Sequence, residues 1–276
     1  MNDTVNPLRQ YFRRPAVYLK LPSAGIGYVE GSINLPDNGE VPIYPMTTID
    51  EITSRTPDAL FNGTAVVDII RSCVPNIIDP WGIPIVDLDP ILIAIRAASN
   101  GDKMEIETAC PSCEEDAKYD VNLTGVLASF KPSDYDKLLT IDELNIKFKP
   151  LKYNEINSSN ILQFEVQRLM GNLQAIDNEE ERSRQTTEVI KKLNEMTITL
   201  LISTIEYIRT PAATVFEPAH IEEFLRNCDK NTFNTIKETN IKLRTESEAK
   251  PLKITCMHCS HEYEQSFVIN VSTFFG

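Results

Sequence analysis

Four of the six cysteines form two Cys-x-x-Cys pairs, and these are the residues in the chain best suited to chemistry. The first pair is Cys110-Pro-Ser-Cys113, and the second is Cys256-Met-His-Cys259 in the other half of the chain. Two thiolates with this spacing supply half of a tetrahedral zinc site, and two such pairs complete a site with four cysteine ligands. We therefore predict one structural Zn²⁺ shared by both pairs, with no coordination position left open for catalysis.

Other interpretations of the two pairs remain open. A redox-active pair of the thioredoxin type needs a strand before it and a helix after it, whereas strand-like segments flank both pairs here. His258 or His261 could replace a thiolate as a ligand, although a solvent-facing histidine is the simpler interpretation. The four thiols could also be unmetallated. We interpret Cys73 and Cys228 as small buried apolar side chains outside the metal site.

The composition is that of a globular protein, and its charge counts against affinity for nucleic acid. Of the 276 residues, 42% are hydrophobic and 24% are charged, and the formal net charge is −13. A negative charge of this size repels phosphate backbones and favours basic patches on protein partners. No apolar run approaches the roughly 20 residues that span a membrane, and Met1–Thr4 lacks the pattern of a secretory signal. We expect an intracellular protein that binds neither nucleic acid nor membranes.

The chain offers no recognisable set of catalytic side chains. With three histidines, no Ser-His-Asp or Cys-His set can be argued, and no glycine-rich phosphate loop of standard spacing is present. The paired acids Asp87 with Asp89, and Glu105 with Glu107, lack convergent partners. We therefore predict that the protein is not an enzyme.

Short strands and amphipathic helices must position the cysteines. Alternating patterns predict strands over 104–109 and 118–123 around the first pair, and over 252–255 and 262–269 around the second. Helical apolar spacing predicts helices over 65–73, 87–100, 155–176, 179–208 and 218–229. Thr47 with Asp50 forms a capping box that begins another helix. The expected fold class is α+β, with helical bundle regions and short β-hairpins joined in a four-cysteine core like that of a zinc ribbon.

The two halves of the chain share four short matches in the same order. They are Ile43–Met46 with Phe148–Leu151, Arg55–Ala59 with Arg209–Ala213, Asp68–Cys73 with Glu223–Cys228, and the two cysteine pairs. We predict an N-terminal arm over 1–20, a first strand–helices–knuckle unit over 21–125 and a second unit over 126–276, where a knuckle is a Cys-x-x-Cys turn between its strands. The second unit carries a helical insertion over about 155–208. The alternative is coincidence among common dipeptides.

Two terminal segments are candidate partner contacts. The arm holds the main basic cluster of the chain: Arg9, Arg13, Arg14 and Lys20. It is either an ordered docking arm or a frayed terminus, and fraying is the simpler interpretation without a partner. Phe274 and Phe275 are either exposed anchors for a partner or part of the packing of the last strand.

Several motifs, most of them within residues 19–125, match a known family. They are Leu21-Pro22-Ser23-x-Gly25, Pro45-Met46-Thr47-Thr48-x-Asp50-Glu51, Ala59-Leu60, Val67-x-x-Ile70-x-x-Cys73, Asp89-Pro90-Ile91-Leu92-Ile93-Ala94-Ile95-Arg96-x-Ala98-Ser99-x-Gly101, Cys110-Pro-x-Cys113 and Tyr119-Asp120-Val121-Asn122-Leu123. Through these motifs the chain resembles the baseplate-hub assembly family of T4-like contractile-tailed bacteriophages. The second half matches mainly through its knuckle.

The resemblance implies a non-enzymatic structural or assembly protein of the central hub or spike of a phage tail baseplate. Such a protein is made in the host cytoplasm and remains in the virion tail baseplate. Its implied partners are other hub, spike and wedge proteins in a hetero-oligomeric assembly. Two alternatives stay open: a transient tail-assembly chaperone that is absent from the virion, and a zinc-ribbon regulator that binds nucleic acid.

Overall fold

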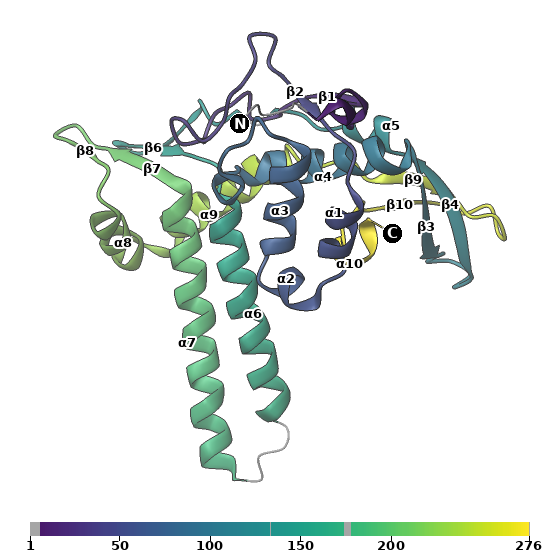
Figure 1. Cartoon of the computed structure of the whole chain (residues 1–276). Coiled ribbons are helices and arrows are strands. Elements are labelled where there is room, and N and C mark those ends of the chain that lie inside the picture. The colour runs from purple at the N-terminus through teal and green to yellow at the C-terminus, as the bar shows by residue number, and fades with distance from the viewer. Residues whose placement is uncertain (1–5, 133, 174–177, 276) are drawn as a thin grey trace.

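The computed structural model describes residues 6–132, 134–173 and 178–275, and in this part of the chain the fold is α+β, as predicted (Figure 1). Met1–Val5 of the arm lie outside the described residues. The helices are η1 (Pro7–Tyr11), α1 (Thr48–Ser54), α2 (Pro57–Phe61), α3 (Thr64–Cys73), η2 (Pro80–Gly82), α4 (Ile85–Asn100), α5 (Leu123–Leu127), α6 (Tyr153–Leu173), α7 (Glu179–Thr204), α8 (Pro218–Asn227), α9 (Lys230–Thr245) and α10 (Val271–Phe274).

The strands form antiparallel hairpins and one larger sheet. Strands β1 (Val17–Lys20) and β2 (Glu40–Ile43) pair, as do β3 (Lys103–Ala109) with β4 (Asp116–Asn122) and β9 (Leu252–Thr255) with β10 (Glu262–Gln265). A four-stranded sheet has the order β5 (Leu138–Ile141), β6 (Leu144–Phe148), β7 (Ile205–Arg209) and β8 (Thr214–Val215). The predicted strands on both sides of each knuckle are therefore present, although β10 ends four residues before the predicted end.

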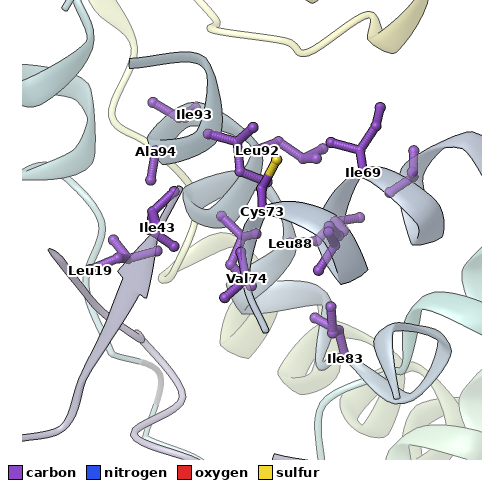
Figure 2. Packing of buried hydrophobic residues seen from close by; sticks show 14 of the residues in the cluster. Leu19, Ile43, Ile69, Cys73, Val74, Ile83, Leu88, Leu92, Ile93 and Ala94 are labelled. Atoms are coloured by element: carbon purple, nitrogen blue, oxygen red, sulfur yellow. The ribbon is translucent and has the colours of Figure 1, made fainter. Parts of the chain in front are cut away.

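Helix α4 is the centre of the main hydrophobic core. Its residues Ile91–Ile95 are all apolar and all buried, which is the pattern of a helix that is covered on every side. Leu19 from β1, Ile43 from β2 and Cys73 from α3 pack in the same cluster, as Figure 2 shows. Gly101 caps the helix with a φ of 87°, at the predicted end. The helix begins at Ile85, two residues earlier than predicted.

A second core lies under the four-stranded sheet, at the base of the α6–α7 hairpin that projects from the body (Figure 1). The predicted helix over 179–208 is wrong for its last four residues, because α7 ends at Thr204 and β7 follows. Ile205 and Ile208 are buried, and they pair with Phe148 and Ile146 of β6. Cross-strand packing therefore outweighs the helical preference of this segment.

The Arg13 side chain anchors the arm on the body, in addition to the pairing of β1 with β2. The Arg13 guanidinium donates hydrogen bonds to the backbone oxygens of Pro45 (2.5 Å) and Ser72 (2.7 Å), and it pairs with Asp50 at 3.3 Å. Asp50 also completes the predicted capping box, since its carboxylate accepts from the Thr47 N–H at 2.7 Å. The described part of the arm is therefore ordered, and the interpretation of it as frayed is wrong there.

Phe274 and Phe275 are buried in the main core and are not exposed anchors. Their side chains are 1% and 5% exposed, and Arg96 of α4 donates a hydrogen bond to the Phe274 backbone oxygen. The interpretation as exposed partner contacts is wrong, and the alternative of intramolecular packing is confirmed. The physical reason is that two phenylalanine rings are more stable against the apolar surface of α4 than in water.

The order of elements in the two halves agrees with the proposed repeat in part. Each half runs from a hairpin (β1–β2 or β5–β6) to a knuckle hairpin (β3–β4 or β9–β10), through helices in the first half and through helices and the strands β7 and β8 in the second. In one of the four matches the two segments have different secondary structure. Arg55–Ala59 spans the α1–α2 junction, whereas Arg209–Ala213 lies at the β7–β8 turn. The repeat and the boundaries of its units stay predictions.

Asp87, which belongs to one of the acid pairs noted in the sequence, is fully buried near the start of α4. Its carboxylate accepts hydrogen bonds from the Ser23 N–H (2.8 Å) and the Ser23 Oγ (2.5 Å), which belong to the Leu21–Gly25 motif. Burial raises the pKa of Asp87 to about 6, although the hydrogen bonds from Ser23 act in the opposite direction.

We expect Asp87→Asn to change how stability depends on pH. Because the folded pKa lies above the unfolded value of about 3.9, the folded state binds this proton more tightly, and the free energy of unfolding of the wild type falls as pH rises from about 4 to about 6. Asparagine cannot ionise but can still accept from the Ser23 N–H. Urea unfolding should show that the free energy of unfolding of the variant, relative to that of the wild type, rises by about 3 kcal/mol between pH 4 and pH 7. Parallel pH curves would contradict this, and the exposed Asp142→Asn is the matched control.

Candidate metal centre

The first knuckle is a tight turn that aims two sulfur atoms to the same side. The Glu114 N–H donates to the Cys110 backbone oxygen (2.9 Å), and the Cys110 N–H donates to the Glu115 oxygen (3.1 Å). Glu114 adopts a positive φ of 60°, and the Ser112 N–H points at the Cys110 Sγ at 3.4 Å. An N–H directed at a sulfur favours its thiolate form.

The second knuckle repeats this backbone geometry. The Ser260 N–H donates to the Cys256 oxygen (2.9 Å), the Cys256 N–H donates to the His261 oxygen (2.9 Å), and Ser260 has a φ of 60°. The His258 N–H lies 3.4 Å from the Cys256 Sγ. Two segments from different halves of the chain thus form the same turn, with donors and cysteines in corresponding positions.

The structure brings all four predicted cysteines together. Their sulfur atoms lie within 4.8 Å of one another, with 3.7 Å between Cys110 and Cys259 and 3.7 Å between Cys113 and Cys256. A tetrahedral Zn²⁺ with Zn–S bonds of about 2.3 Å requires sulfur–sulfur distances of about 3.8 Å. All four are free thiols rather than disulfides. The donor set and its spacing therefore fit a tetrahedral metal ion.

The electrostatics of the cluster also favour a cation. Backbone N–H groups, first that of Cys259 and then that of His258, lower the pKa of Cys256 to about 6. The Glu115 N–H has the largest single effect on Cys113 and lowers its pKa, but burial and the three neighbouring sulfurs together outweigh it and raise the pKa to about 12. Four sulfurs this close cannot all ionise unless a positive charge lies between them.

The knuckle hairpins are held to each other and to the main core. Thr108 of β3 donates through its Oγ1 to the Gln265 Oε1 of β10 at 3.2 Å. Val121 of β4 is buried in the main core, and Leu252 of β9 packs against that core. A two-stranded hairpin is marginally stable alone, so these contacts and a shared ion would support each other.

The remaining cysteines and the histidines lie outside the cluster. Cys73 is fully buried in the main core, as interpreted from the sequence, whereas Cys228 is partly exposed. Among the described residues, the atoms that converge are the four sulfurs, and neither His258 nor His261 contributes to them. The His261 ring instead stacks on Tyr263, with 6.3 Å between the ring centroids.

Together, the fold and the cysteine cluster define an α+β protein with a possible zinc site built from two knuckles. The model of the T4 bacteriophage base plate protein family matches residues 29–276, so the chain belongs to that family. This match includes the α6–α7 hairpin and the second knuckle, whereas most of the motifs noted in the sequence lie within residues 19–125. Searches of curated proteins and of solved structures found no match. None of the described helices has the length and apolar character needed to cross a bilayer.

Proposed function

We propose that the protein is a structural component of the central hub or spike region of a phage tail baseplate, stabilised by one Zn²⁺. The observation that carries the proposal is the convergence of Cys110, Cys113, Cys256 and Cys259 in a chain that belongs to the base plate family. An ion bound there would connect segments from both halves of the sequence and would hold the body rigid while other surfaces contact neighbouring subunits.

The proposed ion has a structural role and not a catalytic one. Four sulfur ligands fill a tetrahedral zinc site, which leaves no position for a water molecule or a substrate. The pH-sensitive carboxylate Asp87 is fully buried and held by Ser23, so its environment is explained by packing. We therefore propose a non-enzymatic protein.

We further propose that the arm (1–20), the first unit (21–125) and the second unit (126–276) are parts of one building block with other baseplate proteins as its partners. The projecting α6–α7 hairpin (Figure 1) and the net charge of −13 are the features that support a role in assembly. The proposed location is the host cytoplasm during assembly and the virion tail baseplate afterwards.

Quantitative mass spectrometry of purified virions tests this function. A structural component should be present at a fixed ratio to an abundant tail protein, and the ratio should survive gradient purification. A transient chaperone should be abundant in infected-cell lysate and missing from the particles. That outcome would contradict the proposed structural role. Baseplate intermediates isolated from the same lysate would show whether the protein was ever bound.

A further inference from the structure

Two buried hydroxyl groups lie on the inner faces of the knuckle hairpins. Tyr119 on β4 and Tyr263 on β10 each belong to the strand that follows a knuckle (Figure 1). Exposed residues alternate with them along both strands, so the two rings point inward. The hydroxyl oxygens are shielded from solvent, and among the described residues neither has a hydrogen-bond partner. A buried hydroxyl without a partner costs free energy and is uncommon in folded proteins, so this pair points to a role beyond packing.

Both tyrosines lie beside the second knuckle. Tyr119 and Ile254 of β9 line one cavity of about 410 Å³, and Ile254 is the cross-strand neighbour of Tyr263. The His261 ring stacks on the Tyr263 ring. The backbone oxygen of His261 accepts from the Cys256 N–H at 2.9 Å, so Tyr263 packs on the residue that closes the turn of this metal ligand.

The hydroxyl of Tyr119 faces the backbone of the same turn. Burial raises the pKa of Tyr119, and the Tyr263 hydroxyl and the negative charge of Cys256 raise it further. The Met257 N–H acts in the opposite direction, which an N–H does when its hydrogen is directed at the hydroxyl oxygen. A donor, an acceptor and a ligand sulfur therefore surround the Tyr119 hydroxyl.

The two knuckles differ at the position that Tyr119 faces. Met257 of the second knuckle corresponds to Pro111 of the first, and proline has no N–H to offer. Six residues after the last cysteine of each pair stand Tyr119 in the first hairpin and Gln265 in the second. Gln265 instead accepts a hydrogen bond from Thr108 at 3.2 Å. The hydroxyl is thus present on the hairpin that faces the knuckle with an N–H, and absent from the hairpin that faces the proline.

We infer that Tyr119 and Tyr263 are positioning residues for the Cys256 sulfur. In the zinc-bound protein, the Tyr119 hydroxyl accepts a hydrogen bond from the Met257 N–H and donates one to the Tyr263 hydroxyl. This contact holds the turn that carries Cys256, as groups outside the ligand shell commonly do for metal ligands. The inference rests on the structural zinc of the proposed function.

The zinc affinity of the full-length protein, measured by competition with a chromophoric chelator, tests this inference. Tyr119→Phe and Tyr263→Phe should each raise the dissociation constant for zinc about tenfold. The double variant should bind zinc about as well as Tyr119→Phe alone, because the two hydroxyls act as one unit. Tyr18→Phe is the matched control, since Tyr18 is 63% exposed on β1, and it should bind zinc like the wild type.

Thermal unfolding separates positioning of a ligand from general packing. Positioning acts through the ion, so Tyr119→Phe should match the wild type in excess chelator and lose stability in saturating zinc. An equal loss under both conditions would overturn the inference. So would an unchanged dissociation constant in Tyr119→Phe beside a wild type that binds one zinc, an outcome that leaves the proposed function intact. A wild type that binds no zinc would overturn both.

Discussion

Replacing Cys110 by Ser should abolish zinc binding and destabilise the protein severely, and Cys256→Ser should do so to a similar extent. Structural zinc contributes on the order of 10 kcal/mol, comparable with the whole stability of a domain. The sulfurs of these two residues come from different knuckles yet lie in one cluster, so either replacement breaks the same site. Thermal unfolding followed by circular dichroism, with metal analysis by mass spectrometry, measures both effects.

Stoichiometry and a matched control make this result specific. The wild type should contain one zinc per chain, and a chelator should lower its melting temperature to nearly that of the variants. Cys228→Ser, outside the cluster and partly exposed, should keep the metal. Two zinc ions per chain, or a large loss of stability in one knuckle variant alone, would show that the knuckles act as separate sites.

Phe274→Ala should cost about 3–5 kcal/mol of stability, which is the usual loss for a large aromatic side chain in a core. Phe274 is 1% exposed, and its ring meets the rings of Phe275 and Phe267 edge to face, with centroid distances of 5.3 Å and 6.3 Å. The guanidinium of Arg96 lies over the same ring at 5.5 Å from its centroid. Denaturant unfolding at neutral pH is the direct measurement.

Phe216→Ala is the control for this second effect, because that side chain is 62% exposed. We expect it to cost less than about 1 kcal/mol. If Phe274→Ala were equally mild, the end of the chain would not be part of the main core. A severe effect would instead show that this core closes only when the last residues pack on α4.

The strands and turns beside the cysteines were predictable because their signals are local. Alternation over 104–109 and 118–123 marks the first hairpin, and the spacing of each cysteine pair is a property of one tight turn. The capping box of Thr47 and Asp50 and the glycine that ends α4 are also short-range signals. Each depends on residues within a single turn or hairpin.

The errors in prediction share a different cause. The segment 205–208 looks helical by itself and becomes β7 because β6 lies beside it. The arm looks frayed until Arg13 contacts Pro45 and Ser72. For Phe274 and Phe275 the sequence left exposure and packing open, and the placement of α4 against them decided for packing. In each case the deciding contact joins residues that are far apart in the chain, and no local pattern records it.

The sequence by itself therefore determined the candidate metal ligands, the α+β class and the family resemblance, since these depend on residue types at short fixed spacings. Only the tertiary structure decided that the four sulfurs meet, that Asp87 is held by Ser23, and that Phe274 and Phe275 complete the core. Those outcomes depend on how distant surfaces exclude water from one another, which is a property of the folded chain as a whole.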